Sequence, residues 1–488
     1  MGDFFFYIFF LAISFLIVIP RSERSSILSL GRLGYGIGAL IIIFLLLQQF
    51  STIVLFDTFA QQGWQLQNQQ SMFSQTLEST PLSDMLTLPP ITAELALSFM
   101  VACFFTSSIF YTLLLSRPHV LVLTSTLYLG ALVVVSIVFL LTPSLFTMFI
   151  AFECLLLTSL GLLKLTSKSE RIGEAVSEMF MWTLFGSFFL LLGFFTAYAE
   201  VGNFLDHCDS TAGLFADPVS GLISFFFIIG FGVKIPVWPF ISWLLKAHVE
   251  ASVEFSILLS GFIVKLGILG LWRILDALAP DWIYLLIFFV SLMAICDATV
   301  RLFAQTDLKR IVALTTVIEM NWLNLCYLAG DINLVFLANF LIVVHCFTTT
   351  SEFLLVEFIS KRYGTRDFWQ ISGLWYNTPV LWYYSFIVVF TTIGFPGTSI
   401  FMAKFIFLLN FIAYSYWIFS LFICIFFFIL PLFFIRLWVP VWFGLPQQHK
   451  SGLIPVLDLT SRELTLLSSS CALGLLLGIF PTFFFDIF

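Results

Sequence analysis

The stretch FGVKIPVWPFISWLLKAHVEASVEFSILLSGFIVKLG, residues 231–267, combines strong hydrophobicity with two features that transmembrane segments usually avoid. Lys234 and Lys265 lie inside otherwise apolar sequence, and Gly232 and Pro236 interrupt the hydrophobic run around the first lysine. A charged side chain in hydrocarbon costs about 2.5–3.5 kcal/mol on insertion scales, so such residues are usually paired, hydrated or functional. Lysine, unlike arginine, loses its proton readily when it is buried. The stretch therefore predicts a broken transmembrane helix beside a path for protons.

The composition is typical of a membrane protein with many spans. The chain has 488 residues, of which 60% are hydrophobic and 10% charged, and its mean hydropathy is +1.06. Runs of about 20 apolar residues recur along the whole length, and each is long enough to cross a bilayer as a helix. We therefore predict an all-α polytopic membrane protein without a soluble domain, and we expect no nucleic-acid partner.

The hydrophobic runs predict about fourteen transmembrane helices. Their expected bounds are 3–20, 31–56, 91–115, 119–141, 143–165, 174–199, 219–244, 252–275, 281–303, 309–329, 332–360, 378–408, 411–441 and 464–484. A polar stretch at 57–90 is expected to form a loop on the outside. The first run begins at Phe4 without a basic segment before it or a small-residue cleavage site after it. We therefore expect a transmembrane helix there rather than a signal peptide.

The placement of basic residues predicts the orientation. If the N-terminus lies outside, 17 of the 21 Lys and Arg residues fall in connections on the inside. The exceptions are the three lysines within apolar segments, Lys234, Lys265 and Lys404, and Arg273, a helix-end anchor near the outside. Inside connections of membrane proteins carry such an excess of basic residues. The segregation supports both the number of helices and an orientation with both termini outside.

Two of the expected helices carry helix breakers at mid-depth. The seventh contains Pro236 and Pro239, and the twelfth contains Pro396 between two glycines. Broken helices at corresponding places in two halves indicate a transport site between inverted repeats. We therefore predict a division into helices 1–3 at 1–118, a first repeat of helices 4–8 at 119–275, a second repeat of helices 9–13 at 281–441, and a C-terminal loop and last helix at 442–488.

Cofactor ligands are not evident in the sequence. The eight cysteines lie singly in apolar contexts and form no CxxC pair, which argues against disulfides, zinc and iron–sulfur ligation. No G-x-G-x-x-G follows a strand and no Walker A motif occurs, so a nucleotide loop is not predicted. We expect no cofactor and no metal in this chain.

The membrane-embedded charges are the candidate functional residues. Glu153 lies ten residues into its expected helix, near mid-depth, and could pair with Lys234 across helices 5 and 7. Its alternative role is that of a structural counter-ion, and Lys234 could instead extend to an interface. Lys265, between two glycines, is expected to be a central carrier. Lys404, close to the second break, is expected to be the terminal group, where any protonatable side chain would serve.

Three further candidates lie on neighbouring helices. Glu319 and His345 fall inside helices 10 and 11, and the ordinary pKa of histidine near 6.5 suits proton transfer. A buried histidine can also be a satisfied core residue. His248 falls at the inside junction of helices 7 and 8, where a solvated loop is the alternative. Glu352 is expected toward the inside surface.

The opening stretch and several others resemble a known family. Residues 231–267 are similar to the signature of chain 4 of mitochondrial-type respiratory complex I, NADH:ubiquinone oxidoreductase, at V-K-x-P, at K-A-H-V-E-A and at the following K-L-G. FECLLLTSL, DLKRIVALTTVIEM, the His345 segment followed by Arg366–Asp367, and GFPGTSIFMAKF match in the same order. The resemblance covers about residues 150 to 410, and the first hundred residues match only as apolar helices.

The resemblance implies an antiporter-like proton-pumping subunit. It implies that Glu153 and Lys234 form an ion pair, that Lys265 is the central relay lysine and that His345 connects the two halves. Three positions depart from the family. Histidine usually stands where Glu319 is, glutamate stands where Lys404 is, and proline stands at Ser252. Sister antiporter-like chains use lysine at the position of Lys404.

The resulting functional hypothesis is a proton-translocating membrane-arm subunit of NADH:ubiquinone oxidoreductase. Because no redox ligands are evident here, NADH, flavin, iron–sulfur clusters and ubiquinone would belong to the parent complex. The implied partners are other membrane-arm subunits, above all the sister chains 2 and 5, and lipids such as cardiolipin. The implied location is the mitochondrial inner membrane, with both termini on the intermembrane-space side and synthesis within the organelle. The alternatives are a cation/proton antiporter subunit, a hydrogenase-linked membrane arm, or a scaffold with degenerate charges.

Overall fold

The structure is a computed structural model that describes residues 93–142, 144–206, 217–278, 280–328, 332–413, 417–445 and 457–481. Across these residues the chain is helical, and its β-type pairing is an isolated bridge between Asp307 and Asp367. The first two expected helices and the loop expected at 57–90 lie outside this part. The predicted all-α membrane fold is confirmed.

The helices follow the expected spans closely. They are α5 (Ala93–Leu114), α6 (His119–Leu141), α7 (Leu145–Thr166), α8 (Ile172–Asp206), α9 (Asp217–Lys234), α10 (Ser242–Glu250), α11 (Val253–Leu258), the π-helix η2 (Leu259–Ile263), α12 (Val264–Leu278), α13 (Asp281–Phe303), α14 (Leu308–Leu328), α15 (Ile332–Tyr363), the 3₁₀ helix η3 (Phe368–Gln370), α16 (Leu374–Asn377), α17 (Pro379–Ile393), α18 (Ser399–Ala413), α19 (Trp417–Phe443) and α20 (Ser461–Ile479). Eight helical segments of the described part are long and apolar enough to cross a membrane, and shorter apolar helices accompany them.

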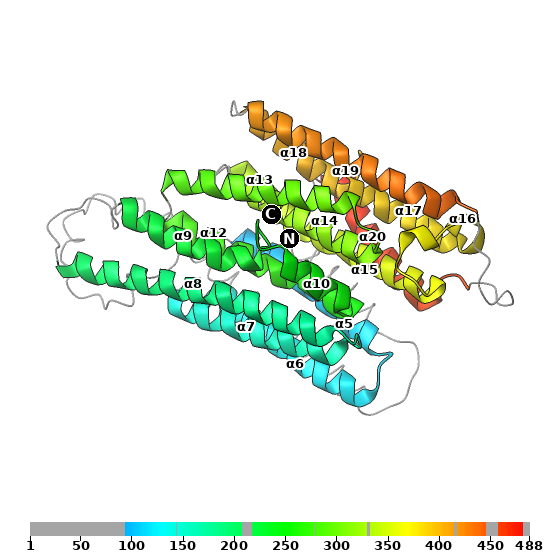
Figure 1. Ribbon diagram of the computed structural model, residues 1–488, viewed down its shortest axis with the longest axis horizontal. Helices are drawn as coiled ribbons and strands as arrows, with labels where there is room; N and C mark the ends of the chain where they lie inside the picture. The colour runs from blue at the N-terminus through cyan, green and yellow to red at the C-terminus, as the bar shows by residue number, and fades with distance from the viewer. Residues whose placement is uncertain are drawn as a thin grey trace, which may run out of the picture.

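The long helices lie side by side along the long axis of the molecule (Figure 1). In this view α6, α7 and α8 form one side of the bundle, and α17, α18 and α19 form the other. The segment from α11 to α12, together with α14 and α15, lies between the two sides, and these helices are almost entirely buried along their apolar lengths. A side chain on one of these central helices is therefore shielded from lipid by other helices.

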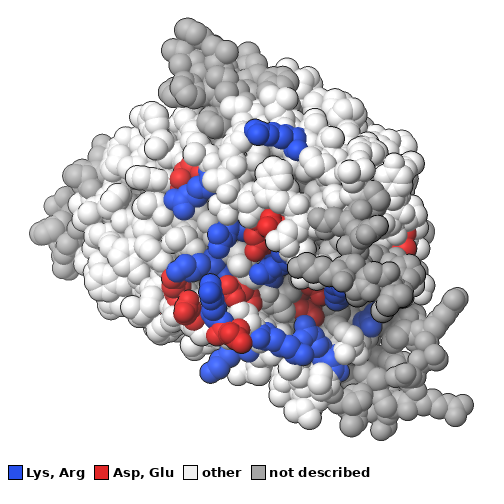
Figure 2. Space-filling view, turned by 45° about the vertical axis from the view of Figure 1, so that its right-hand side comes forward, with Lys and Arg blue, Asp and Glu red and all other residues white. Residues whose placement is uncertain are grey.

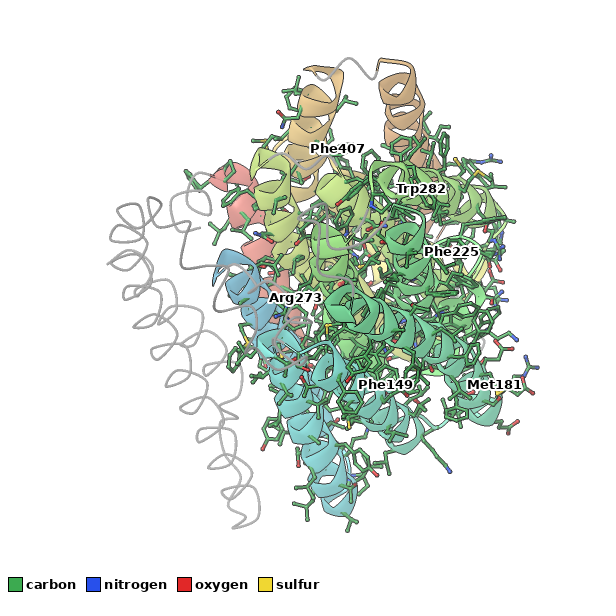
Figure 3. The ribbon with its side chains drawn as sticks, turned by 90° about the vertical axis from the view of Figure 1, so that its left-hand side faces the viewer. Phe149, Met181, Phe225, Arg273, Trp282 and Phe407 are labelled. Carbon is green, nitrogen blue, oxygen red and sulfur yellow. The ribbon has the colours of Figure 1, made fainter. Side chains whose placement is uncertain are left out.

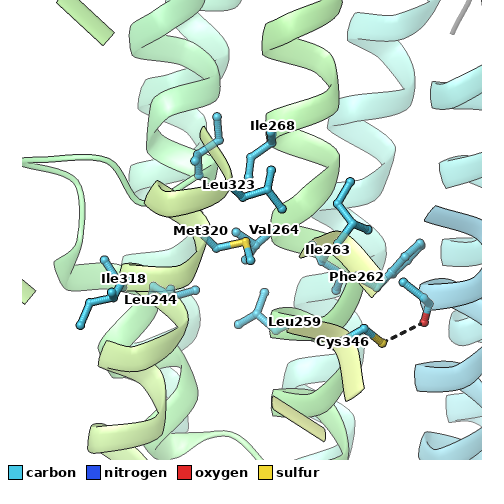
Figure 4. Close-up of a cluster of buried hydrophobic side chains, with 14 of the residues drawn as sticks. Leu244, Leu259, Phe262, Ile263, Val264, Ile268, Ile318, Met320, Leu323 and Cys346 are labelled. Atoms are coloured by element: carbon cyan, nitrogen blue, oxygen red, sulfur yellow. Dashed lines mark hydrogen bonds between the residues drawn. The ribbon is translucent and has the colours of Figure 1, made fainter. Parts of the chain in front are cut away.

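Apolar packing fills the space between the central helices. Met320 of α14 lies beside Val264 of α12 in the buried core (Figure 4). At one side of the same cluster, the Cys346 thiol of α15 donates a hydrogen bond to the carbonyl of Ala102 on α5 at 3.5 Å. This packing fixes the relative positions of α12, α14 and α15, which carry Lys265, Glu319 and His345.

The first predicted helix break is present between α9 and α10. Its interruption frees backbone carbonyl groups, which cannot be left unsatisfied inside a membrane. The indole nitrogen of Trp243 donates to the carbonyl of Val233 at 2.8 Å, and the amide nitrogen of Asn321 donates to the carbonyl of Pro236 at 3.4 Å. Asn321 belongs to α14, so the break is held partly by its own chain segment and partly by a central helix.

The second predicted break separates α17 from α18. Gly394 and Gly397 both take positive φ, at 76° and 94°, where side chains with a Cβ are disfavoured. The two glycines therefore allow the turn that the sequence pattern around Pro396 predicts. This turn places Lys404 in the second turn of α18.

Charged side chains gather at one end of the bundle. Both signs of charge form a band on the face seen in Figure 2. Ion pairs join this end across helices: Arg117 with Glu254, Lys246 with Glu178, Arg362 with Glu463, and Arg366 with Asp307. We call this region the charged end of the bundle. The basic residues of these four ion pairs are among those expected in connections on the inside.

Arg273 was expected to anchor a helix end, and its guanidinium reaches the end of α6. Its side chain is buried, whereas Met181 on α8 lies exposed at the periphery (Figure 3). The guanidinium donates to the carbonyl of Leu140 in the last turn of α6 at 3.3 Å. Arg273 therefore anchors α12 to the end of α6.

Candidate functional site

Lys234 is the last residue of α9 and is almost fully buried beside the first break. Its ammonium nitrogen lies 5.4 Å from the centre of the Phe152 ring, a cation–π contact. Within the described residues, neither this nitrogen nor Oε1 of Glu153 has a hydrogen-bond partner. No direct hydrogen bond or ion pair joins Lys234 and Glu153 in the described part of the chain.

Glu153 nevertheless acts on Lys234 through space. The two groups are close enough for a coulombic attraction; Lys234 is buried, and Glu153 is partly buried on α7. The attraction therefore acts without a direct bond between the two side chains.

Lys234 also packs closely against α12. The approach is close at Gly267, where a Cβ would lie only 3.1 Å from Cβ and Cγ of Lys234. Gly267 is two residues beyond Lys265 on the same helix. The packing therefore brings the lysine of the first break next to the helix that carries the central lysine.

Lys265 is fully buried and is held by two backbone carbonyl groups. Its ammonium nitrogen donates to Gly261 at 2.8 Å and to Ile342 at 2.9 Å. The π-helix η2 ends just before this lysine, and π-helical turns inside α-helices frequently occur at functional sites. Ile342 belongs to α15 and lies three residues before His345, so the bond joins α12 to the next candidate.

His345 is buried on α15 with no hydrogen bond to either ring nitrogen from the described residues. It lies within electrostatic range of Lys265, Lys404 and His248. A buried histidine that served only packing would be expected to satisfy at least one ring nitrogen. Its position between charges on three helices suits a group that passes protons between them.

Glu319 and Lys404 form a buried ion pair. Oε1 of Glu319 lies 2.5 Å from the ammonium nitrogen of Lys404, and the two side chains are 7% and 4% exposed. The ammonium group also lies 5.7 Å from the centre of the Trp322 ring. The two positions that depart from the family pattern in charge are thus in direct contact. Their charges complement one another, which sequence inspection of either position alone does not reveal.

His248 lies in the interior rather than in a solvated loop. Its ring is fully buried and stacks on Phe353 of α15, with centroids 5.1 Å apart. Both of its ring nitrogens lack a partner among the described residues. Lys309, at the start of α14, is buried nearby and donates a hydrogen bond to the carbonyl of Ala251. His248 therefore lies between the charged end and the central helices.

Glu352 lies on the half of α15 that leads to the charged end, and it was expected toward the inside surface. Its side chain is 7% exposed and accepts a hydrogen bond from the Thr315 hydroxyl at 3.3 Å. It also lies within electrostatic range of Glu319 and Lys404. The signal that could have found it is its spacing of seven residues from His345, which places both side chains on one face of a helix.

The pattern of the sequence matches a family model described as "NADH:quinone oxidoreductase/Mrp antiporter, TM" over residues 142–429. The match covers more than half of the chain and includes every candidate charge from Glu153 to Lys404. The chain belongs to this antiporter family.

Named relatives agree with the family assignment. The chain is 31% identical over 269 residues to "NADH-ubiquinone oxidoreductase chain 4" of Paramecium tetraurelia, covering 55% of this chain and 56% of that protein. It is 29% identical over 271 residues to "NADH-quinone oxidoreductase subunit M" of Rickettsia bellii, covering 55% of each. The chain spans about half the length of these curated relatives.

A solved structure shares the fold. A chain of respiratory complex I from Thermus thermophilus with bound NADH superposes with a TM-score of 0.68 at 22% identity, covering 80% of this chain and 82% of that chain. In this antiporter-family chain, the candidate charges lie on α7, α9, α10, α12, α14, α15 and α18. Within the described residues, no group of three His, Cys, Asp or Glu side chains could hold a metal ion.

Proposed function

We propose that this chain is a proton-translocating subunit in the membrane arm of an NADH:quinone oxidoreductase. The observation that carries the proposal is the series of buried titratable groups that crosses the bundle. It consists of Lys234 at the first break, Lys265 and His345 on central helices, and the Glu319–Lys404 pair beside the second break. Buried charges are costly, so a series of them on lipid-shielded helices supports a role in ion movement.

Each residue of the series has its own proposed role in proton transfer. Lys234, without a hydrogen-bond partner among the described residues, can release its proton when the attraction of Glu153 weakens. Lys265 would accept the proton, and its hydrogen bonds to two backbone carbonyl groups would stabilise the resulting ammonium form. His345 would pass the proton onward, and the Glu319–Lys404 pair would store it near the second break. His248 would connect the series to the charged end.

Electron transfer would take place in other subunits. NADH, flavin, iron–sulfur clusters and the quinone would be held there, and this chain would couple to their chemistry through movements of its charged groups. Its neighbours would be other membrane-arm subunits, including the sister chains 2 and 5, with lipids such as cardiolipin at the surface. We place the complex in the mitochondrial inner membrane, with the termini on the intermembrane-space side and synthesis within the organelle.

The matched breaks support two inverted repeats. We propose that residues 119–275 form the first and residues 281–441 the second, with 1–118 before them and 442–488 after them. Each repeat would then contribute one broken helix and one buried lysine close to the break. The Lys265–Ile342 bond would join the two repeats at their centre.

A cation/proton antiporter subunit is the second candidate, because the family description includes Mrp antiporters. Purification of the tagged chain from its native membranes separates the two. The first proposal predicts that flavin, iron–sulfur clusters and NADH oxidation activity co-purify with the chain. Co-purification of a complex that exchanges sodium for protons and contains no redox groups would establish the second candidate instead.

A further inference from the structure

Glu352 is a buried carboxyl group that the series of charges described above does not use. It lies on α15, seven residues after His345 and eleven residues before the end of that helix at Tyr363. At about 1.5 Å per residue, it lies roughly 16 Å from the end of the helix and roughly 10 Å from His345 along the axis. Glu352 is therefore placed between the charged end of the bundle and its centre.

The hydroxyl group of Thr315 suits a carboxyl group that changes its protonation state. This hydroxyl lies 2.8 Å from the carbonyl of Val312 and 3.3 Å from Oε2 of Glu352. Because a hydroxyl has one proton and two lone pairs, it can donate to only one of these oxygens at a time. It can donate to Glu352 when the carboxylate is ionised. It can donate to Val312 and accept from Glu352 when the carboxyl group is protonated.

Glu352 also lies next to the proposed storage pair. Glu319 and Lys404 both lie within electrostatic range of its carboxyl group. Thr315 and Glu319 are four residues apart on α14, so the helix places them on one face, with Thr315 nearer to the charged end. A proton that leaves Glu352 thus has the Glu319–Lys404 pair as its next acceptor toward the centre.

We propose that Glu352 is the group through which the Glu319–Lys404 pair exchanges protons with the charged end of the bundle. This inference rests on the proposed function, since it adds a second connection between the same series and the charged end, apart from that of His248. Thr315 is its positioning residue. The proton moves between carboxyl oxygens and the lysine nitrogen, and no covalent step is involved.

Glu352→Gln tests the inference in the whole complex reconstituted into proteoliposomes. The amide keeps the shape of the side chain but cannot carry a proton, so the proton-to-electron ratio is expected to fall as far as in Lys265→Met. Glu352→Asp should pump better than Glu352→Gln, because aspartate restores the carboxyl group on a side chain that is one methylene shorter. The matched control is Glu357→Gln, five residues further along α15, whose carboxylate pairs with Lys361 at 3.0 Å on the surface. It should pump as the parent complex does.

The outcomes separate this inference from the proposed function. Normal pumping in Glu352→Gln together with impaired pumping in Lys265→Met overturns the inference and leaves the proposed function in place. Normal pumping in both overturns both. If Glu352→Gln fails to assemble, Thr315→Val and Thr315→Ser decide instead. Slower pumping in the valine variant than in the serine variant supports the inference, and equal pumping in the two contradicts it.

Discussion

The ammonium nitrogen of Lys404 lies 2.5 Å from a carboxylate oxygen of Glu319, and both side chains are buried where α18 meets α14. The contact joins the helix after the second break to a central helix of the bundle. Removing one partner of a buried pair leaves the other charge without compensation, at a cost of about 3–5 kcal/mol. Glu319 and Lys404 therefore have to be changed together if their roles in proton transfer and in stability are to be separated.

Lys404→Met should destabilise the chain as well as stop its pumping. The methionine fills the volume of the lysine but leaves Glu319 buried beside Trp322 without a cation. We expect a loss of about 3–5 kcal/mol, seen as a lower content of this chain in the purified complex and a lower temperature of dissociation. Unchanged assembly and thermal stability would show that the pair contributes nothing to the fold.

The exchanged variant, Glu319→Lys with Lys404→Glu, should recover assembly and part of the pumping. Sequence reasoning alone favours Lys404→Glu, because glutamate is also protonatable. The contact with Glu319 changes that expectation, since two adjacent carboxylates cannot both ionise easily. The single change should therefore pump less than the exchanged pair. If the single change pumps as well as the pair, direct contact between the two positions is not required during turnover.

Glu153→Gln should lower pumping while the complex stays intact. Glu153 forms no direct bond to Lys234, so replacing it does not break a hydrogen bond to that lysine. The replacement does remove the negative charge that favours the ammonium form of Lys234. Glu178→Gln is the matched control, because that carboxylate pairs with Lys246 at the charged end. Loss of assembly in Glu153→Gln, with Glu178→Gln assembling normally, would show that Glu153 has a structural role instead.

Asp458→Ala should loosen the start of α17. The carboxylate of Asp458 accepts from the backbone nitrogens of Val380 and Leu381 at 2.7 and 3.1 Å, so it caps this helix from a distant part of the chain. Loss of such a cap costs about 0.5–2 kcal/mol. We expect faster proteolysis near 380 in the purified complex, with Asp458→Asn intermediate. Equal rates for the alanine variant and the parent would mean that other groups satisfy the helix start.

The sequence predicts the helices and their breaks because both depend on local features. Apolar length determines where a helix can span, and Pro236 and Pro396 with their glycines determine where it cannot continue. The positions of Lys234, Lys265 and Lys404 in apolar sequence likewise identify them as unusual. These are properties of single segments, so no knowledge of neighbouring helices is needed to find them.

The partners of the buried charges could not be predicted in the same way. Whether Lys234 meets Glu153 depends on how α9 is placed relative to α7, and whether Lys404 meets Glu319 depends on how α18 is placed relative to α14. The burial of Glu352 likewise depends on the helices packed around α15, which the sequence of α15 alone does not show. Such contacts arise from the rotation and depth of whole helices, which hydrophobic periodicity constrains only loosely.

The central claim, that buried side chains of this chain carry protons, is tested most directly at Lys265. Lys265→Met keeps the side-chain length and the packing between α12 and α15 but removes the proton-carrying nitrogen. The measurement is the proton-to-electron ratio of the whole complex in proteoliposomes during NADH oxidation, with Lys246→Met at the charged end as the control. We expect a lower ratio in Lys265→Met, with this chain present in normal amount, and an unchanged ratio in the control. An unchanged ratio in Lys265→Met would show that protons do not pass through this lysine.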